Sequence, residues 1–475
     1  MRYLICFMII VATSQQAYAL TPIPGEDRFK STLETKNSMG AALGAGFIDE
    51  DFFLKLTLRS ELNLGKIGVG LQIPLNLRVY DKKPKNDNDY YGLVRREDWD
   101  EKSEYLKVIR YVRLGNKRDD FFLRVGELAA QVGHGTIVNR YLNNQNINTL
   151  RVGAQFDINT HYAGFETLVG DIGSFGTDTS QSRVVGGRIY VKPLAFVLAE
   201  DSLLNRLAIG ASFVSDRNAP VTLATTTEPD TGEVFPVTTK EGVFSVEDES
   251  PANVYGADIE IQLLHNDLID LVPYTDFNQI EGAGSGWHVG ALATLKMPIG
   301  FELSIPVRVE YRRFRSNYTP AYFSTFYELE RYTYPLGSDS FATKLQTLRD
   351  MTDNDGINGY YADLAFDFAG LVQVGAVYED YEGANPNMVA FANVPALEIV
   401  QFKAYYERIN IQGTDDIFKL DDRSMVIAEG RYEMVPFVYL VGRFTRRWLL
   451  DGDAAPAKFK PKDDWDVGVE VSFEF

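Results

Sequence analysis

Apolar and polar residues alternate with a period of two between residues 52 and 79. Leu54, Leu56 and Leu58 are separated by polar residues, and the alternation resumes after Gly65-Lys66. This period is typical of a β-strand with one apolar and one polar face. Each half of the predicted hairpin is about 13 residues long, whereas soluble strands usually have five or six. Such strands are long enough to cross a bilayer while tilted.

The same period recurs along most of the chain. It is clear at residues 150–158, 301–312 and 360–368. Weaker candidates lie near residues 40–48, 104–114, 121–130, 161–170, 184–192, 206–215, 254–263, 270–278, 287–296, 371–380, 386–394, 397–408, 424–432 and 435–445. We therefore predict an all-β fold, a transmembrane antiparallel β-barrel with an even number of about 18–20 strands, and 16 strands remain open.

The last eleven residues, 465–475, keep the alternation and end in Phe473-Glu474-Phe475. This segment resembles the closing strand of Gram-negative outer-membrane β-barrel proteins, a porin-like class in which the barrel-assembly machinery reads a terminal Phe. The resemblance implies that Phe473 and Phe475 form an assembly signal and that this machinery is a partner. No specific family within the class matches. A soluble sandwich that ends on an amphipathic edge strand is the alternative.

The first 19 residues predict a signal peptide. Arg2 is followed by an apolar run, and Ala17-Tyr18-Ala19 has the small-x-small pattern of a cleavage site. The only cysteine, Cys6, lies within this segment, so we expect an exported chain without thiols. Residues 20–38 are expected to form a periplasmic or lumenal segment, and residues 39–475 the barrel. The expected location is the outer membrane, with its lipid as the surroundings.

The formal net charge is −19, and it becomes −20 without the signal peptide because Arg2 is its only charged residue. This acidity argues against nucleic-acid binding, which requires a basic surface. It suits a surface in contact with lipopolysaccharide and divalent cations, although a solvated acidic surface is the alternative.

Short and long connections alternate along the chain. We assign the short ones, such as Gly65-Lys66 and Ala369-Gly370, to the periplasm. The long ones, such as residues 214–253, are assigned to the cell exterior. The connection from Arg315 to Ile357 is rich in Tyr and Phe, and it is the candidate for a loop that enters and narrows the lumen.

His134 is the one candidate ligand-binding residue in a loop, because Gly133 and Gly135 flank it. Flexible glycines could let the imidazole approach a ligand, although a structural role in loop folding is the default. A metal site would need partner ligands that the local sequence does not supply. We therefore expect no metal, no cofactor and no catalytic residues.

Charged residues on the polar faces of the strands are expected to point inward. An Arg or Lys that faced lipid at the midplane would cost about 2–4 kcal/mol. The predicted pore-lining residues are Lys55, Arg59, Glu61, Arg151, Asp157, Arg308, Glu310, Arg312, Asp363, Asp367 and Glu379. The alternative is that they form a closed polar network that fills the lumen.

Three hypotheses for function follow. The first is a porin-like channel for passive diffusion of small hydrophilic solutes. The second is a barrel with a closed lumen that acts as a scaffold or surface-binding component of an envelope complex. The third is a transporter of hydrophobic substrates that uses the N-terminal segment as a hatch. An enzyme is not expected.

Overall fold

The computed structural model describes most of the chain. The described residues are 37–48, 51–80, 90–91, 94–95, 99, 105–106, 108–117, 119–143, 151–174, 182–199, 202–227, 232, 234–237, 244–332, 334, 342–352, 356–394, 399–421, 423–451 and 458–474. The expected signal peptide and nearly all of the segment 20–38 lie outside them, as does Phe475.

Within the described residues, the strands form a closed antiparallel barrel of 20 strands. They are β1 (Ser38–Ile48), β2 (Asp51–Leu64), β3 (Ile67–Tyr80), β6 (Ile109–Leu114), β7 (Phe121–Gly126), β10 (Gly153–Asn159), β11 (Ala163–Val169), β12 (Val184–Val191), β13 (Leu207–Leu223), β16 (Val246–Ile261), β18 (Ile269–Ile280), β19 (Ser285–Pro298), β20 (Glu302–Phe314), β21 (Ile357–Phe368), β22 (Val372–Tyr381), β23 (Asn387–Val394), β24 (Val400–Arg408), β25 (Ser424–Val435), β26 (Val438–Asp451) and β27 (Lys458–Glu474).

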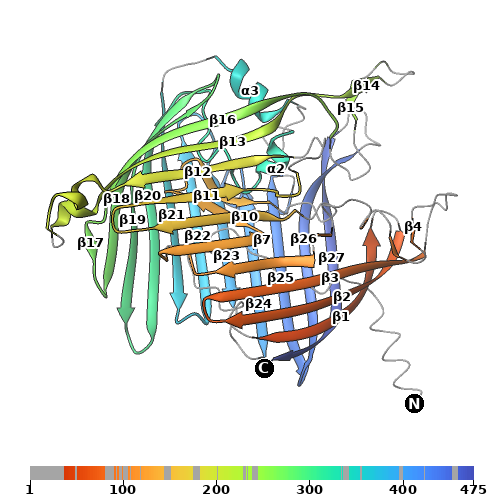
Figure 1. The fold of residues 1–475 in the computed structure, drawn as a ribbon. Coiled ribbons are helices and arrows are strands. Elements are labelled where there is room, and N and C mark those ends of the chain that lie inside the picture. Colours follow the sequence, from red (N-terminus) through yellow and green to blue (C-terminus); the bar gives the residue numbers. More distant parts are fainter. Residues whose placement is uncertain are drawn as a thin grey trace.

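The first and last strands close the barrel (Figure 1). β1 pairs with β27 in a register that places Ser38 opposite Glu474 and Leu43 opposite Val469. A closed barrel leaves no unpaired strand edge in the bilayer. The predicted fold is thus confirmed, the 20 strands lie within the predicted range of about 18–20, and the count of 16 is wrong.

The alternation in the sequence separates the two faces of the barrel wall. On β2, Leu58 and Leu62 are 43% and 41% exposed on the outer face. Lys55 and Thr57 point inward and are each 4% exposed. An apolar outer face and a polar interior are what a barrel in lipid requires. The two faces are therefore those of an integral membrane β-barrel, and the location in the outer membrane stays a prediction.

Shorter elements lie in the connections. They are β4 (Tyr90–Tyr91), β5 (Val94–Arg95), β8 (Ala129–Val132), β9 (Val138–Leu142), β14 (Thr225–Thr227), β15 (Val234–Pro236), β17 (Leu264–His265), α2 (Tyr327–Glu330), α3 (Lys344–Asp350) and the 3-10 helices η5 (Pro193–Phe196), η6 (Leu203–Arg206) and η7 (Thr414–Asp416). No helix among the described residues is long and apolar enough to cross a bilayer.

The tight turns lie at the end of the barrel where β1 begins and β27 finishes. Gly65, Ala369 and Gly370 adopt positive φ angles of 73°, 55° and 71°, which a two-residue turn of this kind requires. At the opposite end, the connection expected at residues 214–253 is shorter than predicted. β13 and β16 extend into it, and register shifts near Asp216 interrupt the period of two that would have revealed them.

Two connections at the end opposite the tight turns fold into the barrel. One is the hairpin of β8 and β9, and the other is the segment 317–332. Their side chains join those of the wall in an apolar cluster. The fully buried members include Ala130, Val138, Tyr141, Val214, Ala252, Ile280, Phe323 and Tyr327. The barrel interior therefore contains an apolar core of its own, beside the charged groups.

Candidate functional site

The hairpin of β8 and β9, residues 129–142, is the element that organises the lumen, and we call it the inserted hairpin. Its turn uses Gly133 and Gly135, with φ angles of 55° and 80°. The segment 317–332 adds main-chain hydrogen bonds: the Phe323 amide donates to the Ile137 carbonyl at 3.1 Å. The Asn139 amide donates in turn to the Phe323 carbonyl, also at 3.1 Å. The two connections thus hold each other inside the barrel.

His134, at the tip of the inserted hairpin, is 3% exposed and lies between two carboxylates. Its Nδ1 is 2.9 Å from Asp276 Oδ1 on β18, and its Nε2 is 2.6 Å from Glu260 Oε2 on β16. The imidazole stacks on the ring of Tyr274 with a centroid distance of 3.9 Å. Burial alone would lower the pKa of His134, but Asp276 and Glu260 outweigh burial and raise that pKa from 6.5 to about 9.

Further ion pairs surround the tip of the inserted hairpin. Arg188 on β12 donates to both carboxylate oxygens of Asp258 on β16, at 2.8 and 2.5 Å. Lys117 lies 2.7 Å from Asp157 and 3.3 Å from Glu166. Lys117 also donates to the main-chain carbonyl of Gln131, at 3.2 Å. The Gly133 amide in turn donates to Glu166 Oε2 on β11 at 3.1 Å, so a charged group of the wall binds the hairpin tip.

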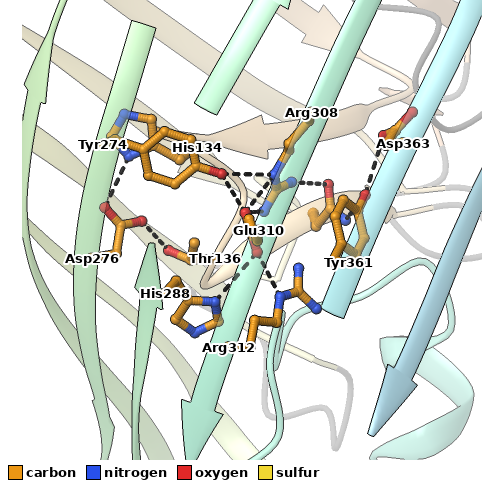
Figure 2. A network of polar contacts seen from close by, with 12 residues as sticks. His134, Thr136, Tyr274, Asp276, His288, Arg308, Glu310, Arg312, Tyr361 and Asp363 are labelled. Carbon is orange, nitrogen blue, oxygen red and sulfur yellow. Dashed lines mark hydrogen bonds and ion pairs between the residues drawn. The ribbon is translucent and has the colours of Figure 1, made fainter. Parts of the chain in front are cut away.

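Arg308, Glu310 and Arg312, three of the predicted pore-lining residues, form a second network on β20, which we call the β20 ladder (Figure 2). Arg308 Nε and Arg312 Nε donate to the two oxygens of Glu310, at 2.6 and 2.5 Å. Both guanidinium groups lie over the ring of Tyr361, 4.6 and 4.1 Å from its centroid. Arg308, Glu310 and Arg312 are 0%, 4% and 1% exposed. The alternative raised from the sequence, a closed polar network, describes this part of the lumen.

The inserted hairpin covers this second network. Arg308 Nη1 donates to Asn139 Oδ1 at 3.4 Å, and Asn139 Nδ2 donates to the hydroxyl of Tyr361 at 3.3 Å. A Cβ at position 135 would lie 2.6 Å from Arg308 Nη1. Gly135 is therefore required twice, for its positive φ and for this close approach.

Four arginines on the strands near the barrel closure form what we call the arginine cluster: Arg59, Arg110, Arg431 and Arg443. Arg59 and Arg431 share Glu470, at 3.6 and 2.9 Å. Arg110 pairs with Glu61, and Arg443 lies 3.4 Å from Glu429. Arg59 and Arg431 thus share one carboxylate among these ion pairs. The side chains of Arg431 and Arg443 retain 13% and 16% exposure.

The remaining predicted pore-lining residues lie at different places. Arg151 binds Glu328 of α2 at 2.5 Å, and Asp363 accepts a hydrogen bond from Tyr361 at 3.1 Å. Asp367 accepts from the Gly370 amide at the turn, and Glu379 lies 3.3 Å from Arg312. A pore-lining role for the predicted set stays a prediction.

Phe473, one half of the predicted assembly signal, is 52% exposed on the outer face. Its ring lies 5.2 Å from that of Phe437. The other half, Phe475, is outside the described residues. The role of these rings in assembly also stays a prediction.

Several site residues escaped the sequence analysis. Asp258, Glu260 and Asp276 lie on strands whose alternation is weak, and their common signal is an acidic residue at an inward position. Glu328 lies in the short helix α2, and its partner Tyr141 is 187 residues away along the chain. A single sequence contains no signal for a pairing of that kind.

No family profile matches this sequence, and no curated protein matches it. Solved structures do. The chain is similar to the outer membrane protein opdK of Pseudomonas aeruginosa, with 9% identity over 92% of this chain and 98% of that one and a TM-score of 0.30. It is also similar to OccK5 (OpdH) of the same organism, with 12% identity over 94% of this chain and 99% of that one and a TM-score of 0.32. A third similar structure is OccAB2 of Acinetobacter baumannii, with 9% identity over 94% of this chain and 100% of that one and a TM-score of 0.30. At such values no residue role or substrate can be transferred. The resemblance to outer-membrane β-barrel proteins that the sequence predicts is confirmed by the closed barrel of this chain.

Proposed function

We propose that the protein is a passive channel for small hydrophilic solutes, with the solute path beside the inserted hairpin, along the arginine cluster. The observation that carries this proposal is the uneven distribution of the inserted segments. Hydrogen bonds and ion pairs join the hairpin to β11, β16, β18, β20 and β21. The arginine cluster lies on β2, β6, β25 and β26.

The charges along this path support a preference for anions. Arg59 and Arg431 share one carboxylate, that of Glu470, and Arg431 and Arg443 keep more contact with solvent than Arg308 and Arg312. Charges in a narrow lumen act at short range, where salt screens them incompletely. Guanidinium groups that reach solvent along the path would therefore attract anions despite the acidic net charge of the whole chain.

The test is a liposome-swelling assay with neutral, anionic and cationic solutes of matched size. Swelling that falls with solute size, and that is faster for the anion than for the cation, supports the proposal. Protein that migrates as a folded barrel in unheated gels but admits no solute contradicts it.

A closed barrel that acts as a scaffold is the second candidate. The observation in its favour is the complete burial of Arg308 and Arg312 beneath the inserted hairpin, together with the apolar cluster inside the barrel. The same assay separates the two, because a scaffold gives intact liposomes of normal size that do not swell. The third hypothesis depends on residues 20–38, which fall almost wholly outside the described residues.

A further inference from the structure

A small cavity lies where the tip of the inserted hairpin meets the wall. Its lining includes His134, Asp258, Asp276 and Asn278, and its volume is about 10 Å³. That is the space of about one water molecule or one ion. These four residues come from the hairpin turn, β16 and β18, and residues of β12 and β13 complete the lining.

His134, Asp258 and Asp276 present ligand atoms to one another in the way that the residues of a metal site do. A ring nitrogen of His134 and one carboxylate oxygen each of Asp258 and Asp276 lie within 4.8 Å of one another, and all three residues are buried. Zinc binds imidazole nitrogen and carboxylate oxygen at about 2.0–2.2 Å. Movements of about an ångström would bring this set to coordination distance.

The surrounding charges also favour a cation. The ion pairs around the hairpin tip connect two permanently charged cations with four carboxylates, and His134 pairs with a fifth. The carboxylates are those of Asp157, Glu166, Asp258, Glu260 and Asp276, and the cations are Lys117 and Arg188. A buried excess of negative charge is costly unless a cation neutralises it. A divalent ion supplies more positive charge than one imidazolium.

Neighbouring side chains form hydrogen bonds with the three ligand residues and fix their orientation, as in known metal sites. Glu260 lies 2.6 Å from Nε2 of His134, so Nδ1, which lies 2.9 Å from Asp276 Oδ1, is the ring nitrogen that would bind the metal together with that oxygen. Thr136 donates to Asp276 Oδ2 at 2.6 Å, and Arg188 orients Asp258.

Asn278 is an independent sign of a ligand. Its side chain lines the cavity, is 1% exposed, and its Nδ2 makes no hydrogen bond among the described residues. A rotation of the amide by half a turn would put its oxygen, which can coordinate a metal, in place of the nitrogen.

We propose that His134, Asp258 and Asp276, with Asn278 as a fourth ligand, bind one divalent transition metal ion, and that Zn²⁺ is the best fit. This departs from the absence of a metal that the sequence predicts. The ion would fasten the tip of the inserted hairpin to β16 and β18. Oxygen-only cations such as Ca²⁺ fit less well because one ligand is an imidazole.

The experiment uses the full mature barrel without an affinity tag, refolded in detergent and stripped with a chelator. Titration calorimetry with ZnCl₂, and elemental analysis after gel filtration, should give one Zn²⁺ per chain. His134→Gln and Asp258→Asn should each weaken binding by at least about 100-fold. His161→Gln is the matched control, because His161 is exposed in a turn. Bound Co²⁺ should give visible absorption bands that His134→Gln abolishes.

Each variant is first checked for the gel shift of a folded barrel, and Asp258→Glu replaces Asp258→Asn if that variant does not fold. Absence of bound Zn²⁺ in the wild type would overturn the proposal. Equal binding by wild type, His134→Gln and Asp258→Asn would overturn it too, because it would show adventitious sites only. Metal stoichiometry is measured without solute flux, so the result is independent of the proposed channel activity.

Discussion

Glu310 is the residue whose removal most directly tests whether the β20 network is buried. Its two oxygens accept hydrogen bonds from Arg308 and Arg312, and His288 lies 3.4 Å away. In Glu310→Gln, two guanidinium groups that are 0% and 1% exposed lose their shared counter-ion. Breaking a buried ion pair costs about 3–5 kcal/mol, because it leaves an uncompensated charge.

We therefore expect Glu310→Gln to lower the free energy of unfolding by about 3–5 kcal/mol, measured by urea titration of the folded barrel in detergent. Glu302→Gln is the matched control, because Glu302 is exposed at the start of the same strand. An exposed substitution of that kind changes stability by about 0.5 kcal/mol or less. The double variant with Arg308→Gln should lose less than the sum of the two single changes.

A Glu310→Gln barrel as stable as the Glu302→Gln control would refute this reasoning. It would mean that water reaches the network and solvates the two guanidinium groups. The burial described for the β20 ladder, and the coverage by Asn139, would then be absent in the membrane.

Three further predictions concern the outer face and the loops. Val309→Arg places a charge at a position that is 48% exposed on the outer face. Near the midplane of the bilayer this should lower the free energy of unfolding by about 2–4 kcal/mol, as measured by urea titration. An unchanged free energy of unfolding would mean that the outer and inner faces of β20 are assigned the wrong way round. A protease site inserted at Gly232 should be cut on intact cells and one at Gly65 should not, whereas the opposite pattern would invert the topology. A hydrogen bond from Arg408, opposed in part by burial, keeps the pKa of Asp416 in η7 below its ordinary value. The loop contacts of Asp416 should therefore be complete above about pH 4 and be lost only as the pH falls through that lowered pKa. Pepsin at pH 3 should then cut Asp416→Asn at residues 409–423 faster than wild type or the exposed control Asp415→Asn, and equal rates would contradict the assignment.

The strands were predictable because lipid outside and charge inside impose a strict period of two. The hairpin around Gly65 and the β20 ladder followed directly from that period. β13 was predicted too short, since the register shifts near Asp216 break the period without ending the strand.

The site was less predictable, because its contacts join distant parts of the chain. His134 could be singled out by its two glycines, but its carboxylates lie 126 and 142 residues further along. The segment 317–332 lies within the connection expected to enter the lumen, while the pairing of Phe323 with Ile137 had no local signal. Which inward charges meet is decided by the closure of the barrel and the insertion of the hairpin.

Single-channel recording of the purified, folded protein in planar bilayers tests the central claim most directly. A passive channel with its path along the arginine cluster should give stepwise conductance and a reversal potential on the anion-selective side in a KCl gradient. Arg431→Gln combined with Arg443→Gln should move that potential toward cation selectivity. Folded protein that inserts into the bilayer and remains silent would contradict the account and favour the closed scaffold.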